Sequence, residues 1–382
     1  MDREQTCYGS YSRFSDALID ASIDPKATVI SFASLSRFPR RTYRPAVYSN
    51  LLNLMAAIWA AFSKKPYLDS QLLSELQRLA EWCHQRNLDC RSIEPRMLKR
   101  RIHLIQYLSK VFIGLLSLLQ VSSVIKACWY GSEGMALALA CSELKISCTD
   151  IQHGIAGGFK HRAYYCWTKF PASGYQMMPN HFWCWTEEDS QQVTANNSSM
   201  AAYPNLISTT LGIPFINAYS NNIVVRDVFD KNPGYIILKE LAANATQTCL
   251  VTLQGPYIPD IVMQLIIEAS PQTYWLLRPH PAHNIKLHQN LLVLSVLHNV
   301  DLCRTAAIPL IQALSLADIH ITEYSASYFE ANQAGVPTVF VSEIALYYFG
   351  DQIHSGQARY ASSANELRAL IAISSKHSFL DI

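Results

Sequence analysis

Residues 318–342 read DIHITEYSASYFEANQAGVPTVFVS, and this stretch decides the fold class of the 382-residue chain. An apolar run leads into a polar turn, the segment YFEANQAG has the length of a short helix, and VPTVFV follows as a second apolar run. Strand, turn, helix and strand in this order are typical of a parallel sheet whose strands are joined by crossover helices. Both apolar runs are nearly continuous, which indicates strands that are buried on both faces.

The same alternation extends over most of the chain, starting once at Val124 and again near Cys249. The expected strands are VIKACWY, ISCTDIQ, HFWCW and TTLGIPF in the first block and CLVTLQGP, TYWLLRPHP, DIHIT and VPTVFVS in the second. We therefore predict an α/β fold with two Rossmann-like domains facing a cleft. We place the domains at residues 1–225 and 226–382, with the polar residues 216–247 as the connection.

The first 120 residues are expected to be mainly helical. One helix with an apolar stripe is expected to begin at Asp69 or Ser70. A longer helix is expected over residues 98–119, with an apolar stripe on one face and basic side chains on the other faces. This longer helix either packs in a core with a solvated basic face or lies on an anionic membrane surface. Gln120 and Lys126 interrupt the apolar run 111–130, so we expect no membrane span, and the charged N-terminus has no secretory signal.

Composition excludes several classes of protein. Half of the residues are hydrophobic and 16% are charged, which excludes a disordered chain. Lys and Arg number 31 against 29 Asp and Glu, so the strong basic excess of a dedicated nucleic-acid binder is missing. The ten cysteines form no C-x-x-C pair, and we expect reduced thiols and a cytoplasmic location.

Two candidate sites follow expected strands of the second block. In Arg278-Pro279-His280-Pro281, two prolines fix the backbone around an imidazole that can donate to a phosphate, and Arg278 can add a bidentate contact. Ser325 and Ser327 lie at a helix start, where hydroxyl and backbone N–H groups can bind an anion. A proline-rich surface loop and plain helix capping are the structural alternatives.

Two further candidate sites follow strands of the first block. Asp150 and His153 lie where a strand runs into a glycine-rich loop, and either could act as a general base toward a sugar hydroxyl. Glu133, in the turn Gly131-Ser132-Glu133-Gly134, is a third candidate base, or only a residue that caps a helix dipole. The neighbouring residues expected to contact an acceptor or to shape the loop are Gln152, Gly154 and Lys160.

Several motifs are missing from the sequence. It contains no G-x-G-x-x-G, no G-x-x-x-x-G-K-[ST], no H-E-x-x-H and no G-x-S-x-G. It also contains no D-x-D, so the usual ligands of a metal-bridged diphosphate are missing. We therefore expect no metal and no cofactor.

With these residues in hand, the chain resembles bacterial surface-polysaccharide glycosyltransferases of the two-Rossmann GT-B architecture. Gln152-His153-Gly154 looks like the Q-H-G turn of capsule and lipopolysaccharide proteins, and His280-Pro281 looks like the H-P motif of sialyl- and Kdo-type transferases. Ser325 and Ser327 fall where those families carry a paired-serine phosphate site. The run from Glu330 to Pro337 resembles their E-A-x-x-x-G-x-P stretch and adds Glu330 to the nucleotide-sugar residues. The families carry an acidic pair before glycine, whereas only Glu133 is present here.

The resemblance covers residues 124–345 and implies a metal-independent glycosyltransferase of capsule or lipopolysaccharide O-antigen biosynthesis. Its donor would be CMP-Kdo or a related CMP-linked ulosonic acid. Its partner would be a saccharide acceptor. If that acceptor is lipid-linked, the enzyme would bind it at the inner face of the cytoplasmic membrane. The alternatives are a UDP-sugar-dependent transferase or 2-epimerase of the same fold and a non-catalytic partner in a polysaccharide assembly complex.

Overall fold

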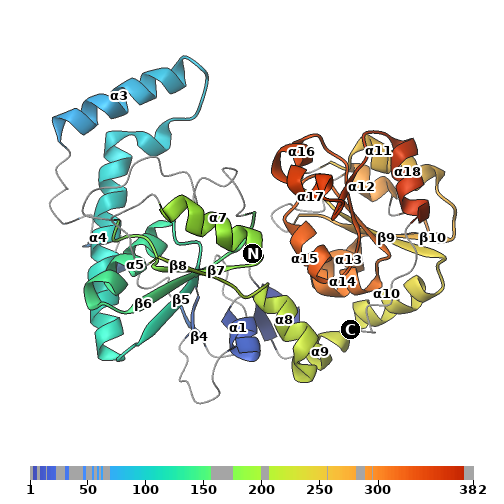
Figure 1. Cartoon of the computed structure of the whole chain (residues 1–382), viewed down its shortest axis with the longest axis horizontal. Coiled ribbons are helices and arrows are strands. Elements are labelled where there is room, and N and C mark those ends of the chain that lie inside the picture. The colour runs from blue at the N-terminus through green and yellow to red at the C-terminus, as the bar shows by residue number, and fades with distance from the viewer. Residues whose placement is uncertain are drawn as a thin grey trace. The chain divides into compact units, whose positions relative to one another are not determined.

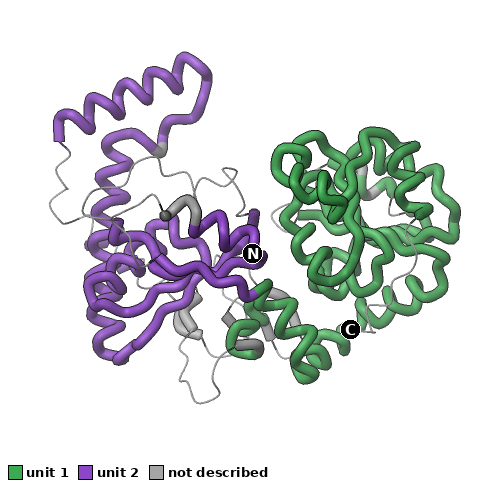
Figure 2. The backbone as a smooth tube through the Cα atoms, viewed as in Figure 1, with its two compact units in different colours: residues 1–29, 39–45, 212–382 green, residues 30–38, 46–211 purple. Residues whose placement is uncertain are grey.

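The computed structural model describes residues 3–6, 9–13, 15–22, 31–33, 46–48, 54–55, 58–59, 62, 69–155, 175–198, 206–255, 257–280, 289–294 and 296–373. Contacts within the chain divide it into two compact units, which Figure 2 colours separately. Unit 1 consists of Met1–Val29, Pro39–Pro45 and Gly212–Ile382, and unit 2 of Ile30–Phe38 and Ala46–Leu211. The domain division at residue 225, and the cleft, stay predictions.

Unit 1 contains a six-stranded parallel sheet with the order β11-β10-β9-β12-β13-β14. The strands are β9 (Gln247–Thr252), β10 (Thr273–Arg278), β11 (Val300–Asp301), β12 (Ile319–Thr322), β13 (Thr338–Phe340) and β14 (Arg359–Tyr360). Counted along the chain, this is the Rossmann order 3-2-1-4-5-6. The order reverses between β9 and β12, and ligands of such sheets bind outside the carboxyl ends of the strands at that point.

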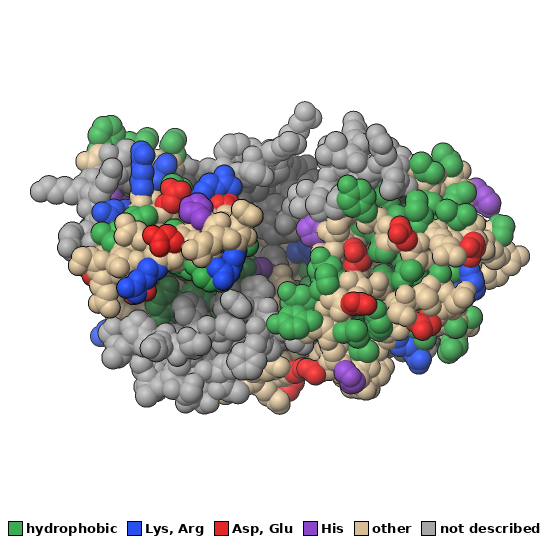
Figure 3. Space-filling view, turned by 90° about the horizontal axis from the view of Figure 1, so that it is seen from above, with side chains coloured by type: hydrophobic (Ala, Val, Ile, Leu, Met, Phe, Trp, Pro, Cys, Tyr) green, Lys and Arg blue, Asp and Glu red, His purple; other side chains and the backbone are tan. Residues whose placement is uncertain are grey.

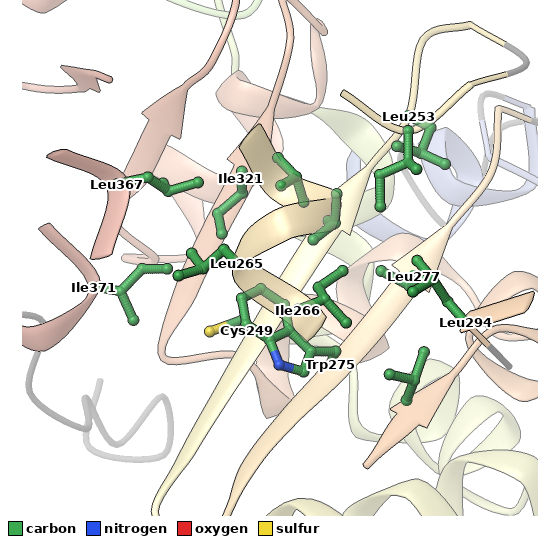
Figure 4. Packing of buried hydrophobic residues seen from close by; sticks show 14 of the residues in the cluster. Cys249, Leu253, Leu265, Ile266, Trp275, Leu277, Leu294, Ile321, Leu367 and Ile371 are labelled. Atoms are coloured by element: carbon green, nitrogen blue, oxygen red, sulfur yellow. The ribbon is translucent and has the colours of Figure 1, made fainter. Parts of the chain in front are cut away.

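Helices cover both faces of this sheet (Figure 1). On one face, α11 (Asp260–Glu268), α12 (Gln289–Leu294) and α18 (Ala364–Ile373) pack their apolar residues on the strands, around the fully buried Trp275 (Figure 4). On the other face lie α13 (Cys303–Ala307), α14 (Leu310–Leu316) and α15 (Ser327–Gln333). After β13 come α16 (Ile344–Tyr348) and α17 (Gly350–His354). The two-sided cover explains the continuous apolar strands of the sequence.

The segment at residues 216–247, expected as the connection between the domains, consists largely of three helices. They are α8 (Pro214–Asn221), α9 (Ile223–Asp230) and α10 (Pro233–Ala243). Asn222 caps α9 by accepting a hydrogen bond from the Val224 amide (3.0 Å), and Asn232 caps α10 in the same way. Eight-residue helices separated by polar caps show little periodicity, and their stability comes from packing rather than from helix propensity.

The N-terminal segment belongs to unit 1. The antiparallel hairpin of β1 (Arg3–Thr6) and β2 (Gly9–Ser12) leads into α1 (Ser15–Ser22), which packs on α8. The buried ring of Tyr11 meets Phe229 edge-on at 5.2 Å between centroids, and its hydroxyl donates to Asp20 at 2.8 Å. Burial of this aromatic residue therefore anchors the segment to helices that follow 200 residues later in the chain.

Unit 2 contains a four-stranded parallel sheet with the order β5-β6-β7-β8. Its strands are β5 (Ser123–Ala127), β6 (Ser147–Ile151), β7 (His181–Cys184) and β8 (Ile207–Thr210), with helices α5 (Ser132–Leu144) and α7 (Glu187–Ser198) between them. A parallel pair, β3 (Ser31–Ala33) and β4 (Ala46–Tyr48), lies outside this sheet. β5, β6 and β7 match the expected strands, whereas β8 shares only Thr209 and Thr210 with the expected segment 209–215. The α/β fold with two Rossmann-like parallel sheets is confirmed.

The helical region before this sheet contains α3 (Ser70–His84), the short helix η1 (Arg91–Ile93) and α4 (Pro95–Leu118). Asp69 caps α3 as expected, accepting from the Gln71 amide at 2.6 Å. The apolar stripe of α4, including Leu108 and Phe112, is buried against α5. The core-helix interpretation of residues 98–119 therefore holds for this stripe. No helix among the described residues is both long and apolar enough to cross a membrane.

Candidate functional sites at the carboxyl ends of the two sheets

In unit 1, a buried polar network holds the strands at the point where the sheet order reverses. His320 Nε2 lies 2.8 Å from Thr252 Oγ1 and 3.3 Å from Ser327 Oγ, and its Nδ1 lies 3.1 Å from Thr338 Oγ1. Burial lowers the pKa of the His320 imidazole to about 3, so the ring is neutral at physiological pH. The network therefore fixes the ends of β9 and β12 and the first turn of α15 relative to one another.

The two serines expected to bind phosphate have different surroundings. Ser327 opens α15, and its buried hydroxyl lies 2.9 Å from Thr252 Oγ1, inside the network beneath the strand ends. Ser325 is half-buried, and its hydroxyl accepts a hydrogen bond from the Ser327 amide at 3.2 Å. The structure thus presents Ser325, and not a pair of serine hydroxyls, in the loop after β12.

Arg278 and His280 follow β10, the neighbour of β9. The Arg278 guanidinium donates to the carbonyl oxygens of Thr305 (2.7 Å) and Ile308, which ties the end of β10 to α13. Two residues on, past the buried Pro279, the half-buried His280 lies at the carboxyl edge of the sheet. Arg278 therefore has a described structural role, and His280 lies at the ligand-binding edge.

Glu330, expected among the nucleotide-sugar residues, projects from α15 and is buried. Its carboxylate forms an ion pair with Arg13 of the N-terminal segment, and the Arg13 guanidinium lies 5.5 Å from the centre of the Phe215 ring. Sequence reasoning missed this pair because its two members lie 317 residues apart.

Aromatic residues border the same edge and were not expected from the sequence. Tyr324 follows β12, and its ring stacks on that of Tyr348 from α16, with centroids 6.4 Å apart and planes inclined by 21°. The exposed Tyr347 meets Tyr348 edge-on at 5.1 Å. The sequence contains a signal for this cluster, because tyrosines follow two strands, β12 and β13, whose carboxyl ends lie at the same edge of the sheet.

In unit 2, Asp150 lies near the end of β6 and is fully buried. Its Oδ1 accepts a hydrogen bond from the Trp129 amide at 3.0 Å, which fixes the loop after β5. Lys126, its register partner on β5, donates from Nζ to the Gly134 carbonyl oxygen, and burial lowers the pKa of this lysine. Asp150 therefore orients the loop after β5.

His153 is paired with Tyr130 at the carboxyl ends of β6 and β5. The Tyr130 hydroxyl lies 2.9 Å from His153 Nε2, and His153 Nδ1 lies 3.4 Å from the Ile151 carbonyl oxygen. Burial raises the pKa of the Tyr130 phenol. A phenol that stays protonated can donate a hydrogen bond to His153 Nε2 and orient the imidazole, so this pair is the strongest acid–base candidate among the described residues of unit 2.

Gln152 is buried and its side chain is fully engaged. The amide oxygen accepts from the Trp185 amide at 2.7 Å, and the amide nitrogen donates to Asp189 and to the Gly154 carbonyl oxygen, both at 2.9 Å. Burial raises the pKa of Asp189. Gln152 therefore joins the loop after β6 to β7 and α7, which gives the Q-H-G turn a structural reason for its glutamine.

The turn between β5 and α5 carries Glu133 and has an unusual backbone. Cys128 has a φ of +63°, a left-handed conformation that non-glycine residues rarely adopt and that is concentrated at functional sites. Glu133 is half-buried in the first turn of α5, where a carboxylate also stabilises the helix dipole. Lys160 lies outside the described residues.

The structure thus brings the predicted residues together within each unit. Glu133, Asp150, Gln152, His153 and Gly154 share one edge of the unit 2 sheet, and Arg278, His280, Ser325, Ser327 and Glu330 lie around the strand ends of unit 1. Within the ranges that the structure describes, no three His, Cys, Asp or Glu side chains gather to hold a metal ion. Whether the reaction needs a metal stays a prediction.

Comparison with known proteins shows the fold. No protein-family model matches the sequence, and no curated protein matches it. A UDP-GlcNAc 2-epimerase from Neisseria meningitidis, solved with UDP-GlcNAc bound, is similar over 78% of this chain and 80% of its own, with 13% identity and a TM-score of 0.50. The fold is GT-B.

Two other solved structures have lower TM-scores. A putative UDP-N-acetylglucosamine 2-epimerase from Listeria monocytogenes has 13% identity over 73% of each chain and a TM-score of 0.49. The glycosyltransferase SsfS6 from Streptomyces sp. SF2575 has 13% identity over 73% of this chain and 67% of its own, with a TM-score of 0.36. These solved structures are enzymes of sugar metabolism.

Proposed function

We propose that this protein is an enzyme that acts on a nucleotide sugar, with a UDP-sugar as the substrate and 2-epimerisation or glycosyl transfer as the reaction. The observation that carries the proposal is the reversal of strand order between β9 and β12, where His280, Ser325 and the neighbouring loops meet at one edge. Backbone and hydroxyl groups at such an edge suit a diphosphate. The solved structure with bound UDP-GlcNAc supports UDP as the nucleotide.

Transfer from CMP-Kdo or another CMP-linked ulosonic acid is less well supported than it was by sequence alone. That assignment rested in part on a pair of serines around one phosphate. Here the Ser327 hydroxyl lies in the network with Thr252 and His320, which leaves the Ser325 hydroxyl in the loop. A single serine with His280 fits a general diphosphate site as well as it fits a CMP-sugar.

In this proposal the two units have separate tasks. In unit 1, His280 and Ser325 bind the phosphates, while Arg278 and Ser327 hold the strand ends in place. In unit 2, His153 and Tyr130 move a proton on or off a sugar hydroxyl or ring carbon, while Asp150 positions the loop. A lipid-linked acceptor, a role in capsule or lipopolysaccharide synthesis and an acceptor contact of Lys160 belong to the same proposal.

Thermal unfolding in the presence of nucleotides tests the binding step. Only a ligand that binds the folded state raises the Tm as the ligand concentration increases. At a free ligand concentration of 100 times the Kd, the folded state is stabilised by about 2.7 kcal/mol. We expect UDP to stabilise the protein more than CMP does, and His280→Ala to abolish the effect. If neither nucleotide raises the Tm, the non-catalytic partner in an assembly complex becomes the better interpretation.

Incubation with UDP-GlcNAc alone tests the reaction. An epimerase needs no acceptor, so inversion at C2, followed by NMR, separates it from a transferase. Tyr130→Phe keeps the ring and removes the hydroxyl, and we expect it and His153→Ala to lower turnover by 10²-fold or more while UDP binding is unchanged. Full turnover in both variants would refute the acid–base assignment.

A further inference from the structure

We infer that an exposed apolar and basic surface on unit 2, formed by the described residues of the 54–62 segment and one face of α4, docks on a membrane with anionic headgroups. Leu54, Met55, Ile58, Trp59 and Phe62 define the apolar part, which we call the apolar ridge. All five are exposed, Phe62 by 87% and Ile58 by 52%. The surface is independent of the reaction proposed above.

The ridge has the geometry of an amphipathic helix. Its five residues have the spacing i, i+1, i+4, i+5 and i+8, which places them on one side of a helix. Leu54, Met55, Ile58 and Phe62 are about half exposed or more, whereas the apolar stripe of α4 is buried against α5. Exposed apolar side chains concentrated on one helix face mark an interaction site.

Trp59 fixes the ridge to α4. Its ring stacks on Tyr107 with 4.5 Å between centroids, meets His103 edge-on at 5.3 Å and lies 5.9 Å from Lys110 Nζ. Tyr107 and His103 lie on the same face of α4 as Arg96 and Arg100, because these residues recur at intervals of three and four. Trp59 therefore lies on the face of α4 that also carries Arg96 and Arg100.

The positive charge of α4 indicates which kind of surface it binds. Helix α4 contains five basic residues, Arg96, Lys99, Arg100, Arg101 and Lys110, and no Asp or Glu. Exposed Trp and Phe side chains together with a basic helix face are typical of helices that lie in the headgroup layer of anionic bilayers. The favoured occupant is therefore a lipid surface.

Helix α3 also exposes apolar side chains in unit 2. It contains no buried residue, and Leu72, Leu79 and Trp82 are exposed, with the Arg86 guanidinium 4.3 Å from the centre of the Trp82 ring. Figure 3, viewed from the side on which α3 lies, shows hydrophobic, basic and acidic side chains together at the surface of this unit. A helix with no buried residue gains little stability from packing within the fold, and its exposed apolar side chains are available for contact with another surface.

Sedimentation with lipid vesicles tests the inference on the full-length chain. We expect binding to vesicles that contain 30% phosphatidylglycerol, weaker binding at high salt, and no measurable binding to pure phosphatidylcholine. The variant Arg96→Gln/Arg100→Gln should bind about 30-fold more weakly, since each basic residue near the surface contributes about fivefold. Ile58→Ser/Phe62→Ser should bind at least about tenfold more weakly, because the apolar side chains no longer insert.

Matched controls separate the surface from general effects. Ile267→Ser in α11 and Lys239→Gln in α10 remove an exposed apolar and an exposed basic side chain from unit 1, and we expect both to bind vesicles like the wild type. All variants should melt within a degree or two of the wild type, because the altered side chains are exposed. Wild-type affinity in either double variant, or no vesicle binding by the wild type, would overturn the inference. A dimer in solution that Ile58→Ser/Phe62→Ser dissociates would overturn it too, by assigning the ridge to a second copy of the chain.

Discussion

Replacement of Gly134 by alanine tests how tightly the turn between β5 and α5 is packed. A Cβ atom on this buried glycine would lie 2.5 Å from the Trp129 carbonyl oxygen, 2.7 Å from the Cys128 carbonyl oxygen and 2.7 Å from Lys126 Nζ. Two of these three atoms belong to the backbone, and Cys128 already has a left-handed conformation. The turn can therefore relieve the overlap only by moving the loop that Asp150 holds.

The size of the effect follows from two opposing contributions. Alanine in place of a helical glycine stabilises by about 0.5–1 kcal/mol. Inserting a methyl group into a closely packed site destabilises by about 1–3 kcal/mol. We expect the overlap to outweigh the helix propensity, with a net loss of about 1–2 kcal/mol, or roughly 2–8 °C in Tm for a unit of this size.

Thermal unfolding followed by circular dichroism measures this loss, and Gly114→Ala is the matched control. Gly114 lies inside α4, and a Cβ atom there would meet nothing within 4 Å. The control should therefore raise the Tm by about 1–4 °C. Binding of UDP should be unchanged in both variants. If Gly134→Ala melts at or above the wild-type temperature, the turn accommodates a methyl group and its described packing does not constrain the loop.

Three further predictions concern unit 1. Burial lowers the pKa of His320 to about 3 from 6.5, so the unfolded chain alone takes up this proton as the pH falls below 6.5. Above pH 6.5 this titration does not lower the free energy of unfolding, and below pH 6.5 it lowers that free energy by up to about 1.4 kcal/mol per pH unit. Urea unfolding between pH 7.5 and 5 measures this dependence, and His320→Asn should make it less steep. Ser327→Ala should destabilise by about 1–3 kcal/mol through the loss of its buried hydrogen bonds and leave UDP affinity unchanged, whereas a loss of affinity with normal stability would place its hydroxyl on the ligand. A double-mutant cycle of Arg13→Met and Glu330→Gln, read by urea unfolding, should give a coupling energy of about 1–3 kcal/mol, and additive effects would show that the ion pair contributes nothing.

Most strands of the two sheets could be predicted from the sequence because each has a nearly continuous apolar run. The strands β11 and β14 were not predicted, because each has only two residues, and β8 begins two residues before the expected segment because its sequence ISTT is largely polar. Both sheets are parallel, so the expected loops necessarily share one edge, and His153 and His280 lie at such edges as the sequence suggested. The three helices over residues 214–243 could not be predicted, since helices of 8–11 residues depend on packing partners that lie elsewhere in the chain.

The roles of individual side chains were harder to predict than the positions of the loops. Ser327 turns inward because His320, seven residues earlier, needs a buried hydrogen-bond partner. Glu330 is neutralised by Arg13, and nothing local to either residue reveals the other. The left-handed backbone of Cys128 is equally hidden, because a cysteine gives no signal for a positive φ. Short motifs therefore locate the candidate sites and leave open which side chains face a ligand.

The assignment of the N-terminal segment to unit 1 has a consequence for how the protein is made. During synthesis Arg13 leaves the ribosome 317 residues before Glu330, its ion-pair partner. At 5–20 residues per second, the hairpin and α1 wait roughly 10–40 s for the helices α8 and α9 that bury Tyr11. The β5–β8 sheet lies wholly within this interval and can form first. The segment that carries Tyr11 therefore stays exposed until α8 and α9 have been translated.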